Sequence, residues 1–261
     1  MRSMDIAATG MLAQQLNVEV ISNNIANLNT TGFKRNRAEF QDLLYQNERK
    51  VGSNSSDQGT IVPAGVQVGI GVKAAAVYRI TEQGNLSPTN NPLDVAIQGR
   101  GYFQIKMPDG TTAYTRAGSF QLSPTGEIVT ADGLVVQPGI TIPADTTAIS
   151  INASGQVLAT ISGQIQPQTV GQFELATFAN EAGLSNLGNN LLAETPASGS
   201  PVTGAPSSVG FGALQQGFLE TSNVNVVTEI TNLITAQRSY EMNSKVIQVS
   251  DQMSNTLNNF R

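Results

Sequence analysis

The stretch MDIAATGMLAQQLNVEVISNNIANL, residues 4–28, repeats apolar side chains every seven residues, with Gln14 as one polar interruption. Such spacing predicts an amphipathic helix with a coiled-coil seam. The helix is expected from about Met1 to Asn29, because residues 27–32 introduce turn chemistry. The seam residues that we expect to make contacts are Met4, Met11, Val18, Ile21, Ile25 and Leu28.

A second amphipathic helix is predicted from about Asn223 to Phe260. Its apolar spacing changes phase after Tyr240 and resumes at Met242. A phase shift of this kind locally unwinds a coiled coil or lets the helix change partners. The alternative is that both helices fold onto the core of their own chain. The expected seam residues are Val226, Ile230, Leu233, Tyr240, Val246, Val249, Met253 and Leu257.

Between the helices the sequence is typical of a compact β domain. Apolar and polar residues alternate over 103–107, and Asp109-Gly110 then separates this run from a partner run over 111–116, which predicts a hairpin. We therefore predict an α+β fold: paired N- and C-terminal helices forming a coiled-coil inner domain, with a central all-β domain of short strands. Further strands are expected at Leu93–Gln98, Glu127–Thr130, Leu134–Gln137, Ala148–Asn152, Gln156–Ile161 and Phe173–Phe178.

Two segments lack a clear periodic pattern. Residues 194–212 are rich in Gly, Pro, Ser and Thr, which predicts a long loop or linker. Residues 46–66 are polar and rich in Gly and Ser, a composition typical of disorder. The expected domains are a discontinuous helical domain (1–32 and 218–261), a connecting segment (33–70, with an insertion at 46–66) and a β-rich domain (71–217).

Composition excludes several enzyme classes. The 261 residues include no Cys and no His, so the usual zinc sites lack their main ligands, and Ser-His-Asp or Cys-His catalysis lacks its base. Asp94 could pair with Asp109, Glu127 or Asp132 as in a glycosidase, but Asp109 and Asp132 each precede Gly and are typical turn residues. We predict no enzymatic activity, no cofactor and no metal.

The charge and hydropathy patterns exclude two kinds of partner. The formal net charge of -5 is small and dispersed, so nucleic acid is not expected. Membrane insertion is not expected either, because no apolar run approaches the roughly 18–20 residues of a membrane span. Residues 1–8 also lack the features of a Sec signal peptide.

Two polar motifs flank the predicted helices. The first, SNNIANLNTTGFK at residues 22–34, resembles the N-terminal signature of the flagellar axial proteins of rod and hook, and ETSNVN at 220–225 with AQRSYE at 236–241 resembles their C-terminal signature. Supporting stretches at 42–46, 83–87, 94–97, 113–120 and 243–245 resemble the distal-rod branch of this family most closely. The signature residues are Asn23, Asn24, Asn27, Thr30, Gly32, Phe33, Lys34, Thr221, Ser222, Asn223 and Asn225.

The resemblance implies a structural subunit of the flagellar basal body, between periplasm and outer membrane. Such subunits polymerise helically with themselves into a hollow, straight, rigid, torque-transmitting tube, in which the terminal helices line the export channel. The implied partners are proximal rod proteins, hook protein, the P- and L-ring bushing and the flagellar type III export apparatus, which replaces a Sec signal. A proximal rod or hook protein, a β-rich adhesin and a wall hydrolase are the alternatives.

The resemblance also implies a role for one polar segment. The insertion at 46–66 corresponds to the stretch that distinguishes distal rod proteins from hook protein, and is expected to pack between neighbouring subunits and stiffen the tube. The residues assigned to this role are Gly52, Ser53, Asn54, Ser55, Ser56, Asp57, Gln58 and Gly59. We further expect the terminal helices to be largely disordered in the monomer, because isolated amphipathic helices are marginal in water.

Overall fold

The structure, a computed structural model, describes residues 2–49, 64–164 and 166–259, with side chains described as far as residue 256. One long helix lies near each end of the chain and short strands fill the sequence between them, which confirms the predicted α+β class. In chain order the elements are α1 Arg2–Ala26, β1 Asn36–Asp42, β2 Tyr45–Arg49, β3 Val66–Gly69, β4 Val72–Arg79, β5 Leu86–Pro88, β6 Val95–Gln98, β7 Tyr102–Lys106, β8 Thr112–Thr115, β9 Gln121–Leu122, β10 Ile128–Val129, β11 Val135–Val136, β12 Thr146–Ile151, β13 Gln156–Ile161, β14 Gln168–Gln172, β15 Leu175–Thr177, the 3-10 helix η1 Glu181–Gly183, β16 Ser185–Gly188, β17 Leu191–Ala193, β18 Val202–Gly204, β19 Ala213–Gln216, β20 Phe218–Glu220 and α2 Val226–Asn259.

The chain divides into two compact units. Unit 1 comprises Met1–Ile25, Asn36–Tyr78 and Asn225–Arg261, whereas unit 2 comprises Ala26–Arg35 and Arg79–Val224. Unit 1 therefore contains both long helices, and unit 2 contains most of the strands. The division into independently folding domains that we derived from the sequence stays a prediction.

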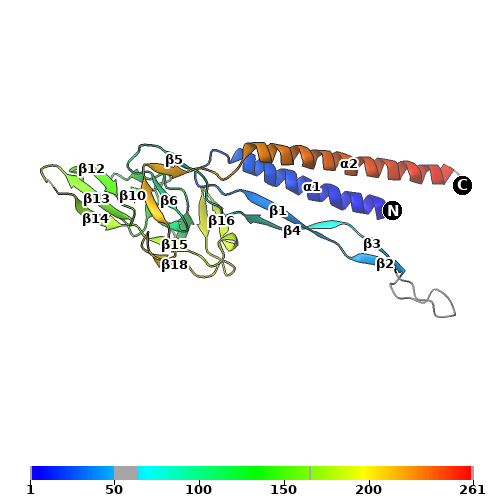
Figure 1. Cartoon of the computed structure of the whole chain (residues 1–261), viewed down its shortest axis with the longest axis horizontal. Coiled ribbons are helices and arrows are strands. Elements are labelled where there is room, and N and C mark those ends of the chain that lie inside the picture. Colours follow the sequence, from blue (N-terminus) through cyan, green and yellow to red (C-terminus); the bar gives the residue numbers. More distant parts are fainter. Residues whose placement is uncertain (1, 50–63, 165, 260–261) are drawn as a thin grey trace. The chain divides into compact units, whose positions relative to one another are not determined.

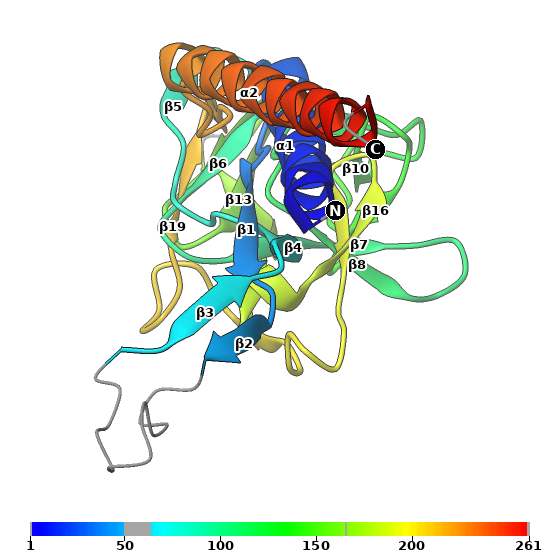
Figure 2. The ribbon, with the colours of Figure 1, turned by 90° about the vertical axis from the view of Figure 1, so that its right-hand side faces the viewer.

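Within unit 1, α1 and α2 lie side by side and run in opposite directions (Figures 1 and 2). The side chain of Asn225 caps α2, since its Oδ1 accepts a hydrogen bond from the backbone N–H of Thr228 at 3.2 Å. Two small antiparallel pairs, β1 with β4 and β2 with β3, complete the described part of this unit.

The segment 33–70, which we expected to connect the helical and β-rich domains, contains strands that the sequence did not predict. β2 pairs with β3, so that Tyr45 lies opposite Gly69 and Gln46 opposite Val68. Every residue of β2 is exposed, so burial on one face imposes no alternation on its sequence. Cross-strand hydrogen bonding, rather than a hydrophobic pattern, defines these strands, and for that reason the sequence did not predict them.

Unit 2 is built from antiparallel sheets. Among the described residues, the largest runs β16-β17-β8-β7-β11-β10-β9, with β15 joined to β7 and β18 joined to β15. The predicted hairpin is confirmed: Phe103 of β7 lies opposite Thr115 of β8, and Asp109 Oδ1 accepts a hydrogen bond from the N–H of Thr111 at 3.0 Å in the turn. The remaining sheets of this unit are β12-β13-β14, β19-β6 and β20-β5.

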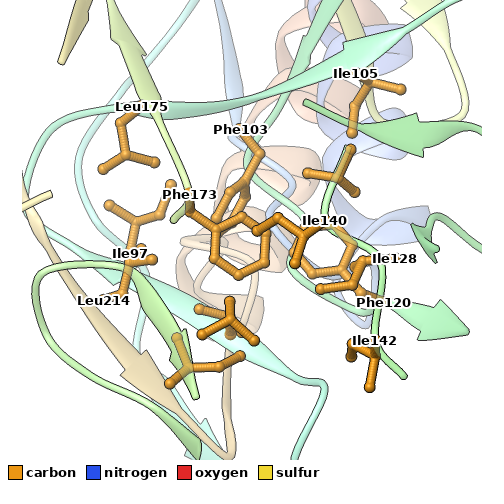
Figure 3. Close-up of a cluster of buried hydrophobic side chains, with 14 of the residues drawn as sticks. Ile97, Phe103, Ile105, Phe120, Ile128, Ile140, Ile142, Phe173, Leu175 and Leu214 are labelled. Atoms are coloured by element: carbon orange, nitrogen blue, oxygen red, sulfur yellow. The ribbon is translucent and has the colours of Figure 1, made fainter. Parts of the chain in front are cut away.

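Three phenylalanines lie at the centre of the unit 2 core (Figure 3). The rings of Phe103 and Phe120 meet edge to face with centroids 5.0 Å apart, and Phe173 lies 6.0 Å from each. Aromatic pairs of this geometry add to the free energy of apolar burial. The core also contains Val95, Ile97, Ile105, Ile128, Val136, Ile140, Val157, Leu175 and Leu214.

The segment 194–212, for which the sequence predicted a long loop or linker, consists mainly of turns and loops and contains one short strand, β18. Within it, β18 pairs with β15, with Thr203 opposite Ala176. Ser198 is buried, and its Oγ accepts a hydrogen bond from the N–H of Thr195 at 3.0 Å. The composition suggested a loop because Gly, Pro and Ser occupy its turns, but cross-strand bonds to β15 hold the segment within unit 2.

Candidate assembly surface

The two helices contact each other through small and polar side chains. Ser3 and Ser250 share a hydrogen bond with their Oγ atoms 2.7 Å apart, and the Nδ2 of Asn24 donates to Glu229 at 3.3 Å. At Gly10, a Cβ atom would lie only 2.8 Å from the amide nitrogen of Asn243. The three contacts pair residues 24 and 229, 10 and 243, and 3 and 250. From one contact to the next, the residue number on α1 falls by 14 and then by 7, and the number on α2 rises by the same amounts. This antiparallel heptad register is called the polar seam below.

The polar seam differs from the apolar seams predicted from the sequence. On α2 it includes the buried residues Glu229, Ala236 and Ser250. Apolar heptads did not indicate this seam, because it repeats small and polar residues at the same period. The contact between the helices therefore uses few of the apolar side chains that α2 carries.

The predicted apolar seam of α2 is exposed to solvent in the single chain. Six of its eight residues are exposed, from 36% at Val226 to 54% at Met253, whereas Leu233 is half-buried. Single exposed apolar residues are common on protein surfaces, but contiguous apolar patches are typical of interaction sites. The exposed members are Val226, Ile230, Tyr240, Val246, Val249 and Met253, and the side chain of Leu257 lies outside the described residues.

The predicted seam of the first helix is more covered. Ile21 is buried within unit 1. Four other seam residues on α1 are half-buried: Met4, Met11, Val18 and Ile25. Leu28, which is also half-buried, lies beyond the C-terminal end of α1 and belongs to unit 2. The role of both seams in contacts between copies stays a prediction.

The N-terminal signature forms the end of α1 and the turn after it. Asn24 is buried, and its side chain exchanges two hydrogen bonds with the backbone of Asn36, at 2.8 and 2.9 Å. Asn27 accepts a hydrogen bond from the hydroxyl of Thr30 at 3.1 Å, and Thr30 accepts one from the N–H of Phe33 at 3.2 Å. Asn23 is exposed on α1. These residues fix where the helix ends.

Gly32 occupies a position that other residues would not fit. Its φ of +69° lies in the left-handed region, and a Cβ there would lie 2.9 Å from the backbone nitrogen of Ala117. Its N–H donates to the backbone carbonyl of Glu220 at 2.8 Å. The signature glycine therefore joins the N-terminal segment of unit 2 to β20.

The C-terminal signature ties three segments of unit 2 together. The Oδ1 of Asn223 accepts from the N–H of Arg35 at 2.8 Å, and its Nδ2 donates to the carbonyls of Ile80 and Glu82 at 3.0 Å each. Thr221 donates to the carbonyl of Asn85 through both its backbone and its hydroxyl. Ser222 Oγ accepts a hydrogen bond from the N–H of Val224 at 3.3 Å.

A buried charge cluster lies beside these ties. The Glu220 side chain is fully buried and pairs with both Lys34 and Arg116, whose side chains are less than a tenth exposed. Glu220 Oε2 lies 2.6 Å from Arg116 Nε, and Oε1 accepts from the N–H of Gly84 at 2.9 Å. Glu220 and Arg116 lie within family-like stretches, but the sequence did not show that they would meet Lys34.

The remaining donors of the cluster also have partners. Arg116 donates to the carbonyls of Gly101, Ile97 and Gly99 at 2.6, 3.1 and 2.5 Å, and Lys34 donates to the carbonyl of Glu82 at 2.7 Å. Buried charges are tolerated when they are paired and hydrogen-bonded in this way. The cluster therefore links Lys34 and Glu220, which lie near ends of the two chain segments of unit 2, to Arg116 within the unit.

Burial and charge act in opposite directions on the Glu220 carboxyl. Burial alone would raise its pKa, but Arg116 and Lys34, with their hydrogen bonds, hold the pKa below its usual range. Burial lowers the pKa of Lys34, because the ammonium loses water, and Glu220 offsets part of that effect. Protonation of the Glu220 carboxyl therefore couples the cluster to acid.

Within the described ranges, the structure shows no group of three or more His, Cys, Asp or Glu residues placed to hold a metal ion. No helix in the described part of the chain is long and apolar enough to cross a membrane. The residues assigned to stiffening, 52–59, lie outside the described residues, although β2 and β3 flank the segment that contains them.

Comparison with known proteins gives matches over most of the chain. The family model of the flagella basal body rod protein matches residues 4–34, that of the flagellar hook protein FlgE/F/G D1 domain matches 96–159, and that of the flagellar basal body rod FlgEFG protein C-terminal matches 215–260. Relatives with the name flagellar basal-body rod protein FlgG are 62% identical in Caulobacter vibrioides and 55% in Agrobacterium fabrum, each over 97% of both chains. A protein of the same name in Bacillus subtilis is 40% identical over 100% of this chain and 99% of its own.

Proposed function

Because this chain belongs to the FlgG family of flagellar basal-body rod proteins, and is therefore a structural subunit of the flagellar rod and not an enzyme, we propose that it forms the distal part of that rod. Copies of the chain assemble helically into a hollow, straight shaft that transmits torque to the hook. The single observation that carries this proposal is the exposed apolar surface of α2, which the polar seam leaves unused.

The energetics favour assembly through the helices. Fully burying one large apolar side chain is worth roughly 1.5–3 kcal/mol, and a side chain that is already half covered gains about half of that. Ile230, Val246 and Val249 are each about half exposed. Each subunit that joins the polymer therefore contributes the free energy of burying these three side chains. Unit 2, by contrast, buries most of its large apolar residues within its own core, and those that its strands expose, Leu122, Leu187 and Val202, lie on three separate strands.

The wider partners follow from the family. Proximal rod proteins and hook protein adjoin the distal rod at its two ends, and the P and L rings surround it as a bushing. The subunits reach their place between the periplasm and the outer membrane through the flagellar type III export apparatus, and the terminal helices line the channel for later subunits.

Residues 52–59 stiffen the shaft by packing between neighbouring subunits. If they do, replacing them with a Gly/Ser linker of equal length leaves unit 2 folded but yields shafts that bend in electron micrographs. Shafts as straight as those of the parent chain would contradict this role. A linker of the same composition at residues 108–111, the exposed turn between β7 and β8 of unit 2, is the control.

A pair of charge substitutions on α2 tests the proposal that the chain assembles with itself. Ile230→Asp places a carboxylate in the exposed apolar surface, whereas Thr228→Asp places the same charge two residues earlier on an exposed polar position. Sedimentation and electron microscopy of the concentrated protein are expected to show assembly of Thr228→Asp and loss of assembly of Ile230→Asp. Equal assembly of both variants would contradict the proposal.

A further inference from the structure

The exposed apolar residues of α2 lie on two different flanks of the polar seam. Successive residues of an α-helix are about 100° apart around its axis. Ile230 follows the seam residue Glu229 by one position, so it lies about 100° to one side. Met242 and Val249 each precede a seam residue, Asn243 or Ser250, by one position, so they lie about 100° to the other side.

The change of flank occurs between Tyr240 and Met242. All exposed large apolar residues before it lie on one flank and all those after it lie on the opposite flank. The first flank comprises Val226, Val227, Ile230, Ile234 and Tyr240, and the second flank comprises Met242, Val246, Val249 and Met253.

The exposed residues on the opposite flank of each half are polar. One apolar residue, Ile247, lies on that side of the second half, but it is half-buried. In the first half of α2, the side of the seam opposite the apolar flank carries Thr228, Asn232, Thr235 and Ser239. In the second half, the side opposite the apolar flank carries Ser244, Gln248, Asp251 and Asn255. The hydroxyls of Thr235 and Ser239 donate to the backbone of their own helix, to the carbonyls of Thr231 and Thr235 at 2.9 Å. The apolar surface therefore crosses the helix once, and each half offers one apolar flank.

One neighbouring helix cannot cover both flanks. A helix contacts a neighbour through a stripe roughly 100° wide, whereas the two flanks lie on either side of the seam that α1 occupies.

The charges on α2 also permit copies of the chain to approach. Arg238 and Glu241 form an ion pair at 3.9 Å, and Lys245 lies between the carboxylates of Glu241 and Asp251 along the sequence, so neither flank carries a strong field of one sign.

We propose that α2 docks two different copies of this chain, one on the first flank and another on the second flank. The inference rests on the proposed self-assembly and specifies its geometry: each subunit uses one helix to join two neighbours. The polar seam sets this geometry, because it fixes how α2 is rotated against α1 and so fixes where the flanks point.

Trace cross-linking tests the proposal directly. The chain contains no Cys, so Ile234→Cys and Val249→Cys place one maleimide–benzophenone probe on each flank. A small amount of the doubly labelled chain is assembled with a large excess of unlabelled wild-type chain in a sulfate salt, which strengthens the burial of apolar surface. The sedimented material is irradiated and separated on a denaturing gel.

The proposal predicts products of three chain masses from the doubly labelled chain, because each probe reaches a different neighbour. The matched control, Ile230→Cys with Ile234→Cys, carries both probes on the first flank and is expected to stop at two chain masses. If the labelled chain stays in the supernatant, p-benzoyl-phenylalanine at the same positions introduces a smaller, apolar change.

The outcomes separate this inference from the proposed function. Absence of any sedimented assembly by the wild-type chain would overturn the self-assembly itself and the inference with it. Assembly with products of only two chain masses from the cross-flank pair would overturn the two-neighbour arrangement alone. Equal yields of three-chain products from the cross-flank and same-flank pairs would also overturn it.

Discussion

Replacing Glu220 by Gln is expected to destabilise unit 2 severely. The fully buried carboxylate faces Lys34 and Arg116 and accepts the N–H of Gly84. Gln keeps the shape and one acceptor, but it removes the charge and directs an NH2 group at groups that can only donate. The two cations then remain buried without a counter-charge.

The magnitude follows from the burial of the cluster. Removing one partner of a buried ion pair costs about 3–5 kcal/mol. Unit 2 consists of segments of 10 and 146 residues, and for a domain of that size 1 kcal/mol shifts Tm by about 2–4 °C. We therefore expect the Tm of unit 2 to fall by roughly 6–20 °C.

Thermal unfolding followed by far-UV circular dichroism measures this shift. The control is Arg100→Gln, which breaks an ion pair with Glu181 in the same unit, but whose side chain is 65% exposed. Exposed pairs contribute about 1 kcal/mol or less, so the control is expected to lose only a few degrees. A Glu220→Gln variant that melts within about 3 °C of the parent, or at the same temperature as the control, would show that the buried charge cluster does not stabilise unit 2 as expected.

Three further predictions concern the acid response of Glu220, the polar seam and the two ends of the chain. The folded-state pKa of Glu220 is lowered, so the ionised carboxylate stabilises unit 2 fully above the ordinary glutamate pKa of about 4.3. This stabilisation is lost as the pH falls through the folded-state pKa. Between neutral pH and a pH of about 2, the Tm of the parent should therefore drop more than the Tm of Glu220→Gln. Gly10→Leu should push α1 from α2 at Asn243 and destabilise the helix pair by about 1–3 kcal/mol in urea unfolding of the assembled protein, in which both helices are ordered. Gln15→Leu, on an exposed position of the same helix, should have little effect, and equal effects of the two variants would contradict the polar seam. Limited proteolysis of dilute protein should remove roughly the first 30 and last 40 residues and leave a resistant unit 2, as expected for isolated amphipathic helices that are marginal in water, and full protection of both ends would contradict it.

The sequence predicted best those elements that local chemistry determines. Asp109-Gly110 between two alternating runs identified the β7–β8 hairpin, because the turn and the alternation indicate the same structure. The apolar heptads likewise identified both helices to within a few residues of their ends. The change of phase after Tyr240 was visible before the structure, but the flank to which each half points was not.

The polar contacts escaped prediction because they depend on register between distant segments. Ser3 meets Ser250 and Asn24 meets Glu229 across more than 200 residues, and nothing local marks these residues as partners. The signature residues were recognised as a motif, but their roles became apparent only in the structure. Asn223, for example, satisfies backbone groups of two other segments.

Strands with exposed faces escaped prediction for a different reason. β2 is exposed along its whole length and most of β4 is exposed, so neither shows the alternation by which a half-buried strand is recognised. Their pairing with β3 and β1 comes from backbone hydrogen bonds alone.

A cryo-electron-microscopy reconstruction of the assembled chain tests most directly the claim that the terminal helices build the polymer. We predict a tube in which Ile230, Ile234 and Val249 of each α2 are buried against other copies of the chain. A reconstruction in which these side chains face solvent, while unit 2 makes the contacts between copies, would contradict it.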